Sequence, residues 1–516
     1  MSTPPASPAA FAHLVDLASD ATGAFAVHAS DDYFAGKENL LKPSAPQWIE
    51  GKYTDKGKWM DGWESQRRRE PGHDDCILRL GMAGEVHGLL VDTTHFKGNA
   101  PQEVSLEALS APDTATAAAL LDDPGWTEIL PRTPVKPDFP NVLQLPAASG
   151  RVSHVRLRIY PDGGVARLRV YGVVRPDPRT FWRPGSIDLA AVEHGGTIAA
   201  VSDQFFGPPS NLLLPGRGVN MGDGWETKRR RTPGSDWCVL RLGRRGVVDR
   251  IELDTHFFKG NAPQATLIEA LDATALPPGA PLLEERLRAP GGWPVLLGRT
   301  PIVQHRRHVL EPDRPLTATH LRVHIFPHGG VNRLRVYGHA LDTPDEQRAL
   351  AAFHALPIAE ARSLLLSFNG ARVFAERMLS RLPLPRARAF FQAAEDVGWS
   401  LDEGDWLEAF AAHPRLGQAK AAATQTERSA AWSKGEQSGL ADAAEDVAAR
   451  LAALNGRYLE KFGFTFILFA TGRTPADVLA HLEERLENDR AAEIENAARE
   501  QAKITRLRIG KWLLSS

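Results

Sequence analysis

The chain has 516 residues, of which 43% are hydrophobic and 24% charged, and its formal net charge at pH 7 is −2. At about 100 to 200 residues per domain, this length predicts two to four domains, each with its own core. The balanced charge gives no electrostatic reason for a polyanionic partner, so nucleic-acid binding is not expected.

The N-terminal segment "MSTPPASPAAFAHLVDLASD" lacks the basic start and the sustained apolar stretch of a secretory signal. No apolar run of 18 residues follows, so no membrane span is expected. The cysteines, Cys76 and Cys238, are too few for a disulfide framework, and we expect both to be small buried side chains. The sequence thus predicts a cytoplasmic protein without a membrane partner.

The first two-thirds of the chain contains one pattern twice. The blocks of the first copy are "SDDYFAGKENLL" (30–41), "DGWESQRRREPGHDDCILRLG" (61–81), "VDTTHFKGNAPQ" (91–102), "RTP" (132–134) and "LRIYPDGGVARLRVYG" (157–172). They return in the same order at 202–213, 223–243, 253–264, 299–301 and 323–338. The offset between copies falls from 172 to 162 across residues 42–59, which places the main insertion there. Five ordered blocks predict a duplicated domain.

Within each copy, apolar and polar residues alternate in segments such as "CILRLG" and "ARLRVYG", and Gly, Pro, Asn and Asp separate them. This periodicity predicts short antiparallel strands with one solvated face, and the arginines of "VRLRIY" and "ARLRVY" are expected on that face. We predict two tandem all-β jelly-roll sandwiches over residues 12–178 and 179–343. Exposed sandwich edges favour a homo-oligomer.

An all-α helical domain is predicted over residues 348–516, where Ala, Leu, Arg and Glu dominate and apolar residues recur three and four positions apart. In "SLDEGDWLEAFAAHPRLG" (400–417), Ser400 and Glu403 have the spacing of a capping box, and Pro414 ends the helix just after His413. A histidine at this position can interact favourably with the helix dipole or can act in catalysis. The sequence of this helix alone does not distinguish between the two roles.

Four blocks of this domain, "HPRLG", "AAWSKGEQSGL", "LNGRYLEKFGFTFILFATGRT" and "ITRLRIGKWL", resemble the 2-oxo-4-hydroxy-4-carboxy-5-ureidoimidazoline (OHCU) decarboxylases of urate breakdown in content, order and spacing. The resemblance implies that His413 is the catalytic acid. It also implies a set of substrate-binding residues: Pro414, Ser433, Glu436, Gln437, Phe466, Ile467, Leu468, Phe469, Ala470 and Arg508. Loss of CO2 leaves an electron pair that the conjugated ring can accept, so no cofactor is expected. A proton donor and partners for the ureido and carboxylate groups then suffice.

The duplicated blocks resemble allantoicase, whose fold is a pair of jelly-roll repeats and whose reaction hydrolyses allantoate to ureidoglycolate and urea. That substrate needs cationic donors, polar acceptors, and a general base or a divalent metal; the metal question stays open. Polar residues of the repeated blocks are candidates for substrate binding or catalysis. They are Glu64, Arg67, Arg68, Arg69, Asp92, His95, Lys97 and Asn99 in the first copy, and Glu226, Arg229, Arg230, Arg231, Asp254, His256, Lys259 and Asn261 in the second.

The two copies need not both be active. Aligned on the shared "FKGN", His95 and His256 differ by one position, and in a strand such neighbours face opposite sides. A tandem carbohydrate-binding module is the alternative for this half, since jelly rolls also serve that role. Together the resemblances predict a bifunctional enzyme of urate degradation acting on small molecules. Its reactions are not consecutive, because one makes allantoin and the other uses allantoate.

Overall fold

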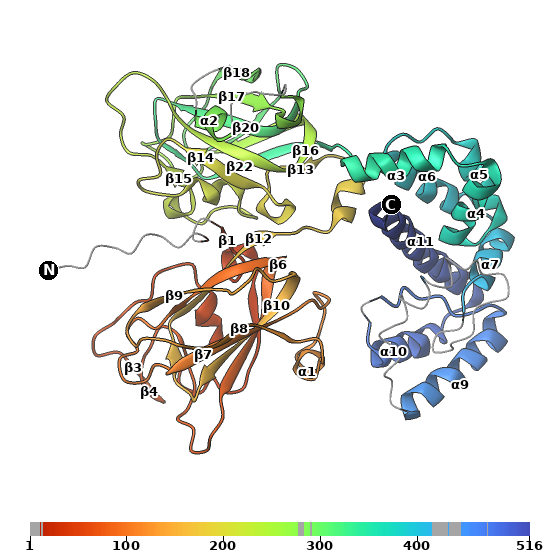
Figure 1. The fold of residues 1–516 in the computed structure, drawn as a ribbon, viewed down its shortest axis with the longest axis horizontal. Coiled ribbons are helices and arrows are strands. Elements are labelled where there is room, and N and C mark those ends of the chain that lie inside the picture. The colour runs from red at the N-terminus through yellow and green to blue at the C-terminus, as the bar shows by residue number, and fades with distance from the viewer. Residues whose placement is uncertain are drawn as a thin grey trace. The chain divides into compact units, whose positions relative to one another are not determined.

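The computed structural model describes residues 11, 14–276, 283–288, 292–414, 432, 445–471 and 473–515. Two compact units form: Met1–Asp177 with Ser186–Leu341, and Pro178–Gly185 with Asp342–Ser516 (Figure 1). The first unit holds the two β-rich repeats, and the second is helical. The predicted fold class, a duplicated β-sandwich followed by a helical domain, is confirmed.

Repeat 1 is built from strands and one short helix, α1 (Ala117–Leu121). The strands are β1 (Val15–Asp16), β2 (Phe25–Ala29), β3 (Tyr53–Thr54), β4 (Gly57–Lys58), β5 (Trp63–Glu64), β6 (Asp74–Asp92), β7 (Glu103–Leu109), β8 (Thr127–Pro134), β9 (Pro140–Gln144), β10 (Arg151–Tyr160), β11 (Gly164–Val165) and β12 (Arg167–Val174). The main sheet has the order β1-β12-β6-β10-β7-β8, and β2 and β9 also pair with β6.

The long strand β6 connects the two layers of the sandwich. Its first part, residues 74–79, pairs with β10 and β2, whereas residues 84–92 pair with β12 and β9. The pairing of β10 with β6 shifts its register between Val152 and His154, which is the mark of a β-bulge or a similar irregularity. Alternate residues of β6 are buried, which gives each layer an apolar inner face.

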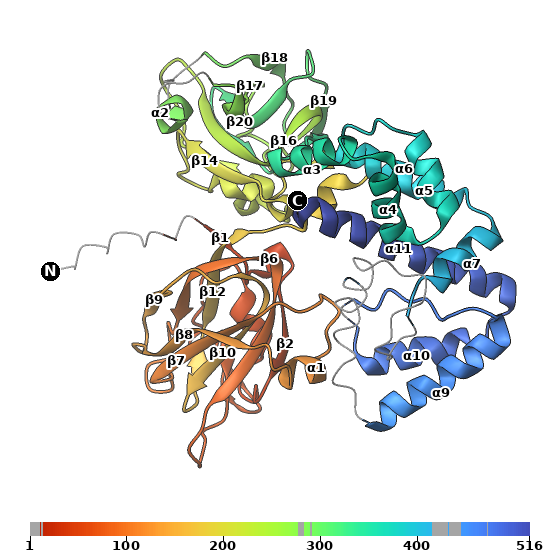
Figure 2. The ribbon, with the colours of Figure 1, turned by 45° about the vertical axis from the view of Figure 1, so that its right-hand side comes forward.

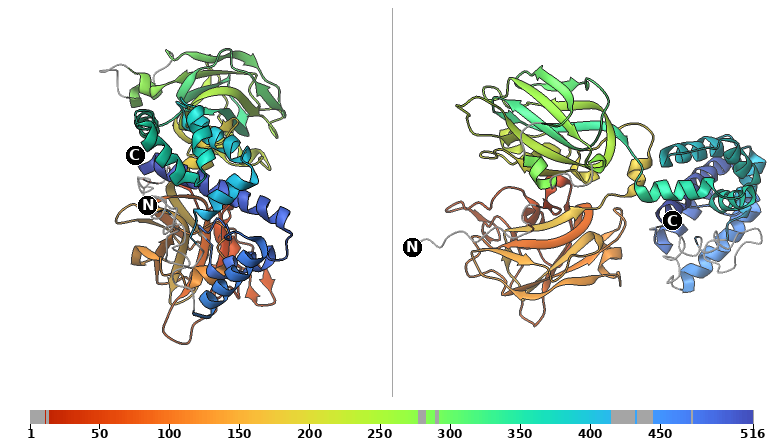
Figure 3. Two further views of the ribbon diagram at one scale, coloured as in Figure 1. Left: turned by 90° about the vertical axis from the view of Figure 1, so that its right-hand side faces the viewer. Right: turned by 45° about the horizontal axis from the view of Figure 1, so that its top comes forward.

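Repeat 2 has the same arrangement. Its elements are β13 (Ile187–Asp188), β14 (Thr197–Val201), β15 (Trp225–Glu226), β16 (Asp236–Asp254), β17 (Ala265–Leu271), α2 (Leu283–Arg288), β18 (Val295–Pro301), β19 (Arg307–Leu310), β20 (Thr317–Phe326), β21 (Gly330–Val331) and β22 (Arg333–Ala340). The order β13-β22-β16-β20-β17-β18 repeats that of repeat 1. Figure 3 shows the strands of each repeat in two further views. β16 again supplies the long strand.

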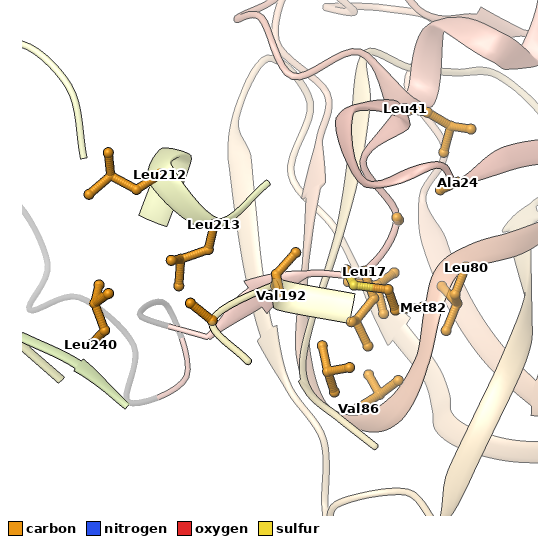
Figure 4. Close-up of a cluster of buried hydrophobic side chains, with 14 of the residues drawn as sticks. Leu17, Ala24, Leu41, Leu80, Met82, Val86, Val192, Leu212, Leu213 and Leu240 are labelled. Carbon is orange, nitrogen blue, oxygen red and sulfur yellow. The ribbon is translucent and has the colours of Figure 1, made fainter. Parts of the chain in front are cut away.

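The two repeats share one hydrophobic cluster. Figure 4 shows Val192 of repeat 2 beside Leu17, Met82 and Val86 of repeat 1, and all four side chains are buried. Burial of such aliphatic side chains contributes about 1.5 to 3 kcal/mol each. Cys76 and Cys238 are free and lie in the same cluster, as expected for small buried side chains.

The expectation that the alternating arginines face solvent is wrong. Arg167 is only 1% exposed, because a loop covers the outer face of β12. Its guanidinium pairs with Asp61 at 2.6 Å and donates to the carbonyl of Ser44 at 2.9 Å. Arg156 is buried too and donates to the carbonyl of Leu120 at the end of α1. These arginines therefore fasten loops to the sandwich, and Arg167 holds the insertion at 42–59.

The helical unit packs its helices around the long C-terminal helix (Figure 2). Its helices are α3 (Pro344–His354), α4 (Ile358–Asn369), α5 (Arg372–Ser380), α6 (Ala387–Trp399), α7 (Glu403–Ala411), α9 (Glu445–Phe462), α10 (Pro475–Arg485) and α11 (Arg490–Ser515). Trp182, from the segment before repeat 2, joins this core and stacks on Phe391 at 4.9 Å. None of the helices in the described part of the chain combines the length and hydropathy that crossing a bilayer requires.

The capping box predicted before His413 is shifted. The box is formed by Asp402 and Asp405, whereas Ser400 caps the C-terminal end of α6. Asp accepts the N3 amide as well as Ser does, and the Ser400 hydroxyl donates instead to the carbonyl of Val397. His413 nevertheless lies just beyond α7, where its amide donates to the carbonyl of Phe410 at 3.1 Å.

Candidate active sites

A cavity of about 550 Å³ in repeat 1 brings four of the predicted site residues together: Glu64, His95, Lys97 and Asn99. Glu64 lies on β5, and Asn99 lies in the loop after β6. The Asn99 amide donates to Glu64 Oε1 at 2.7 Å. Burial raises the pKa of Glu64, and the Asn99 hydrogen bond offsets only part of that effect. The cavity therefore presents an oriented carboxyl group that accepts a proton more readily than an exposed glutamate.

The repeated "GG" motif holds the Asn99 loop in place. Gly164 of β11 donates its amide to the carbonyl of Asn99 at 2.7 Å. A side-chain β-carbon at Gly164 would lie 2.0 Å from the ring of Phe96, which excludes any larger residue. Gly330 has the same relation to Phe258 in repeat 2. The motif thus lets a strand pass close behind the loop that carries the asparagine.

The insertion at 42–59 forms one wall of the cavity, together with the adjacent Met60. Trp48 and Lys58 line it, and β3 and β4 form a small hairpin there (Figure 1). The Lys58 ammonium lies 4.0 Å from the centre of the Trp48 ring. The His95 ring lies 5.7 Å from the Trp48 ring, centre to centre. The sequence showed the insertion but gave no reason to place Trp48, Lys58 or Met60 in a site.

The corresponding place in repeat 2 differs. Asn261 donates to Glu226 Oε1 at 2.6 Å, as in repeat 1. The Met221 sulfur, however, lies 3.6 Å from the Asn261 amide nitrogen. A partly exposed methionine from the shorter loop of repeat 2 therefore contacts the asparagine of this pair.

His95 and His256 occupy different environments. Both lie in a turn after the long strand, so a one-position shift does not place them on opposite strand faces. The residue that aligns with His95 is Phe257, and both have left-handed backbones, with φ of 73° and 69°. His95 lines the cavity, whereas His256 stacks on His305 with ring centres 4.1 Å apart.

The remaining acidic candidates close these turns. Asp92 accepts the amide of Thr94 at 2.9 Å, and Asp254 accepts that of His256 at 2.8 Å. Both aspartates are buried at the end of their strands. Neither Asp92 nor the first arginine triplet lines the repeat 1 cavity.

The middle arginine of each triplet forms an ion pair inside its own repeat. Arg68 Nη1 lies 2.7 Å from Asp74, and Arg230 Nη2 lies 2.8 Å from Asp236. Both aspartates are buried at the first residue of the long strand. The outer arginines are exposed: Arg67, Arg69, Arg229 and Arg231.

Replacing Arg68 with Met should lower the free energy of unfolding by about 1 to 3 kcal/mol, because it leaves the buried Asp74 carboxylate without its charged donor. Arg230→Met should do the same in repeat 2. Arg67→Met is the matched control and should change stability by less than about 0.5 kcal/mol. Denaturant unfolding followed by tryptophan fluorescence measures all three, and equal effects at Arg67 and Arg68 would contradict a structural role for the middle arginine.

In the helical unit, His413 lies close to Arg508 and Gln501. Burial of the ring, followed by the positive charge of Arg508, lowers the pKa of His413 to about 3, and the Gln501 amide works in the opposite direction. Arg508 is 1% exposed, and its Nη1 donates to the carbonyl of Ser367 at 3.4 Å. The site therefore holds a neutral imidazole beside a buried cation at neutral pH.

The segment of Phe466, Ile467, Leu468, Phe469 and Ala470 follows α9 and is largely buried. It forms neither a helix nor a strand, and no strand lies in the described part of this unit to pair with it. Pro414 is partly buried next to His413. Ser433, Glu436 and Gln437 lie outside the described residues.

Within the described residues, no three His, Cys, Asp or Glu side chains come close enough together to hold a metal ion.

Both parts of the chain match known families. Residues 15–175 and 187–341 match the allantoicase repeat. A probable allantoicase of Burkholderia mallei is 44% identical over 326 residues, which cover 63% of this chain and 94% of the relative. This chain belongs to the allantoicase family. The allantoicase of Dictyostelium discoideum is 42% identical over 338 residues, 64% of this chain and 89% of that protein.

The crystal structure of Saccharomyces cerevisiae allantoicase superposes with a TM-score of 0.53 at 37% identity, covering 63% of this chain and 92% of that chain. Residues 354–510 match the OHCU decarboxylase family, so the allantoicase repeats are fused to an OHCU decarboxylase domain. The fusion is a bifunctional enzyme of purine catabolism. Membership of the allantoicase family also decides against a tandem carbohydrate-binding module.

Proposed function

We propose that the chain hydrolyses allantoate to ureidoglycolate and urea in the repeat 1 cavity, and decarboxylates OHCU to (S)-allantoin at His413. The observation that carries the first assignment is the difference between the two repeats. The Glu64–Asn99 pair lines a cavity, whereas in the equivalent Glu226–Asn261 pair the asparagine contacts Met221. Repeat 2 then serves mainly to complete the shared core.

The cavity suits the chemistry of allantoate. Its lining includes the cations Lys58 and Lys97, which can pair with the substrate carboxylate. Asn99 holds one oxygen of Glu64 and so orients the carboxylate to accept a proton from the attacking water or from a ureido N–H. The water oxygen bonds to the central carbon, the carbon–nitrogen bond to one ureido group breaks, and the nitrogen takes the proton, so that ureidoglycolate and urea form. His95 lies at the cavity wall and can hydrogen-bond a ureido group.

The surroundings of His413 suit decarboxylation. A substrate carboxylate beside Arg508 neutralises the positive charge that disfavours the imidazolium, so His413 can take up a proton when the substrate binds. Loss of CO2 leaves its electron pair on the ring carbon, and the imidazolium delivers its proton there. Donation from one side fixes the configuration of the product. This half needs no cofactor, because the conjugated ring accepts the electron pair.

Several features stay predictions from the sequence: a cytoplasmic location, a homo-oligomeric state, the absence of nucleic-acid partners, and the roles of Ser433, Glu436 and Gln437. A divalent metal in the allantoicase half also stays open. Since allantoin and allantoate differ by one ring-opening hydrolysis, a separate hydrolase must act between the two reactions.

The test is to assay the intact chain on allantoate and on freshly generated OHCU, with and without a chelator. We expect urea from the first substrate, and CO2 with (S)-allantoin from the second, the latter unchanged by the chelator. Loss of urea release on chelation would assign a metal to the allantoicase half. Failure to convert either substrate in the untreated chain would contradict the corresponding assignment.

A further inference from the structure

Residues 466–470 of the helical unit need hydrogen-bond partners for their backbone amides and carbonyls, and they form no secondary structure that would supply them. Phe466, Ile467, Leu468 and Ala470 are 2 to 8% exposed, yet the segment is neither helix nor strand. Buried amide and carbonyl groups without partners are costly, so side chains must satisfy them. In this segment that role falls mainly to three charged residues from α10, α11 and the loop between α9 and α10.

Arg485, the last residue of α10, makes the most buried of these contacts. Its Nη1 donates to the carbonyl of Ile467 at 2.7 Å, and its guanidinium lies 4.7 Å from the centre of the Phe466 ring. Arg485 is only 7% exposed. One side chain thus fixes both the backbone and a ring of the segment.

Glu493 of α11 orients this guanidinium. It is fully buried and accepts from Arg485 Nε at 2.8 Å. Tyr458 also donates to Glu493, and Asn488 does so at 2.8 Å. A buried ion pair costs several kcal/mol per ion to desolvate, and well-packed apolar residues often stabilise a fold as well or better. The stability of the fold therefore does not explain why these two residues are charged. The hydrogen bond from Arg485 to the Ile467 carbonyl does, because it holds the segment in place.

The far end of the segment is held from α11 as well. The amide of Phe469 donates to Glu500 at 2.8 Å, and the Phe469 carbonyl accepts from Arg473 at 3.0 Å. Glu500 lies one residue before Gln501, which faces His413, and eight before Arg508. The helix that carries the site residues Gln501 and Arg508 therefore also sets the position of the segment.

We propose that Arg485, oriented by Glu493, is a positioning residue for decarboxylation: it fixes the backbone of 466–470 relative to Arg508 and His413. The inference rests on the proposed decarboxylation at His413 and on the family resemblance, which implies that residues 466–470 bind the substrate. It assigns a role in the reaction to an ion pair that has no contact with substrate.

The decisive variant is the double replacement Arg485→Met with Glu493→Leu. It removes both charges together and so leaves no unpaired buried charge, and the unit should still fold. The melting temperature should fall somewhat, because the buried Tyr458 hydroxyl loses its acceptor and the Ile467 carbonyl loses its donor. Without that donor, the segment shifts. We expect KM for OHCU to rise about tenfold and kcat to fall about tenfold, since small misplacements at a site are costly.

Two further variants separate positioning from general structure. Arg485→Lys keeps a charge for Glu493 but cannot also span to Ile467, so KM should rise about threefold, between the wild type and the double variant. Arg490→Met removes an exposed arginine of α11 that pairs with Glu403, and should leave both constants unchanged. Urea release from allantoate by the same preparations should stay at the wild-type rate throughout.

A double variant that unfolds cooperatively above the assay temperature and keeps kcat/KM within twofold would overturn the positioning role. If the double variant does not fold, an unchanged KM in Arg485→Lys overturns it instead. Failure of the proposed function looks different: the wild-type chain itself would then make no allantoin, or His413→Asn would still make it.

Discussion

Replacing His413 with Asn is expected to reduce decarboxylation of OHCU by about 100-fold to 10,000-fold and to leave urea release from allantoate at the wild-type rate. A positioned acid contributes roughly this factor, and Asn keeps the size and polarity of the side chain without a group that titrates near neutral pH. Production of CO2 and of urea is measured on the same preparation. Loss of both activities in a folded variant would contradict the assignment of separate sites.

His354→Asn is the matched control for this variant, because His354 is exposed and accepts only a structural hydrogen bond from the Leu384 amide. Its decarboxylation rate should match that of the wild type.

The lowered pKa of His413 gives a second readout. The folded state keeps His413 neutral down to about pH 3, whereas the unfolded chain protonates it near its ordinary value of 6.5. Stability from this group is therefore present above pH 6.5 and is lost as the pH falls towards 3. The Asn variant should lose less stability over that window.

Replacing Glu64 with Gln is expected to lower urea release by about 100-fold or more, because the amide cannot accept a proton from water or from a ureido group. Gln keeps the acceptor that Asn99 uses, so the loop should stay in place. Glu226→Gln is the matched control from repeat 2, where Met221 contacts the asparagine of the equivalent pair. It should release urea at close to the wild-type rate, and decarboxylation should be unchanged in both variants.

The pH profile adds a test of the role of Glu64. Because burial raises the pKa of its carboxyl group, the acidic limb of urea release should fall at a higher pH than for an exposed glutamate. If Glu226→Gln proved the inactive variant and Glu64→Gln the active one, the reaction would belong to repeat 2. Equal losses in both would mean that each repeat contributes a working site.

The duplication and its jelly-roll strands are predictable from the sequence because they rest on long, local patterns. The five repeated blocks and the period of two both survive in the structure as paired repeats with the same strand order. The shift between His95 and His256 is visible in the sequence too. The structural consequence of this shift cannot be predicted from the sequence, because both histidines lie in turns with left-handed backbones at His95 and Phe257 rather than in alternating strands.

The arginines show where composition fails. Arg68 and Arg167 look like solvated cations in the sequence, but their partners are an aspartate six residues away and one 106 residues away. Whether a loop folds over an arginine depends on tertiary packing, which the alternating pattern does not encode. The same limit applies to Trp48 and Lys58, which the sequence places only in an insertion.

The helical site is predictable through its resemblance and not through its own pattern. His413 and Arg508 lie 95 positions apart in the sequence, and the blocks of the family were needed to connect them. The hydrogen bond between Arg485 and the Ile467 carbonyl could be predicted neither from the sequence pattern nor from the resemblance. It joins the end of a helix to an irregular segment, so it depends on the tertiary fold.

The most direct test of two separate sites is a mixed-substrate measurement on the intact chain. Urea release from saturating allantoate is followed while freshly generated OHCU is being decarboxylated in the same solution. Independent sites predict that urea and CO2 both form at the rates measured with each substrate alone. Mutual competitive inhibition, with each product slowed by the other substrate, would contradict two sites and require a shared one.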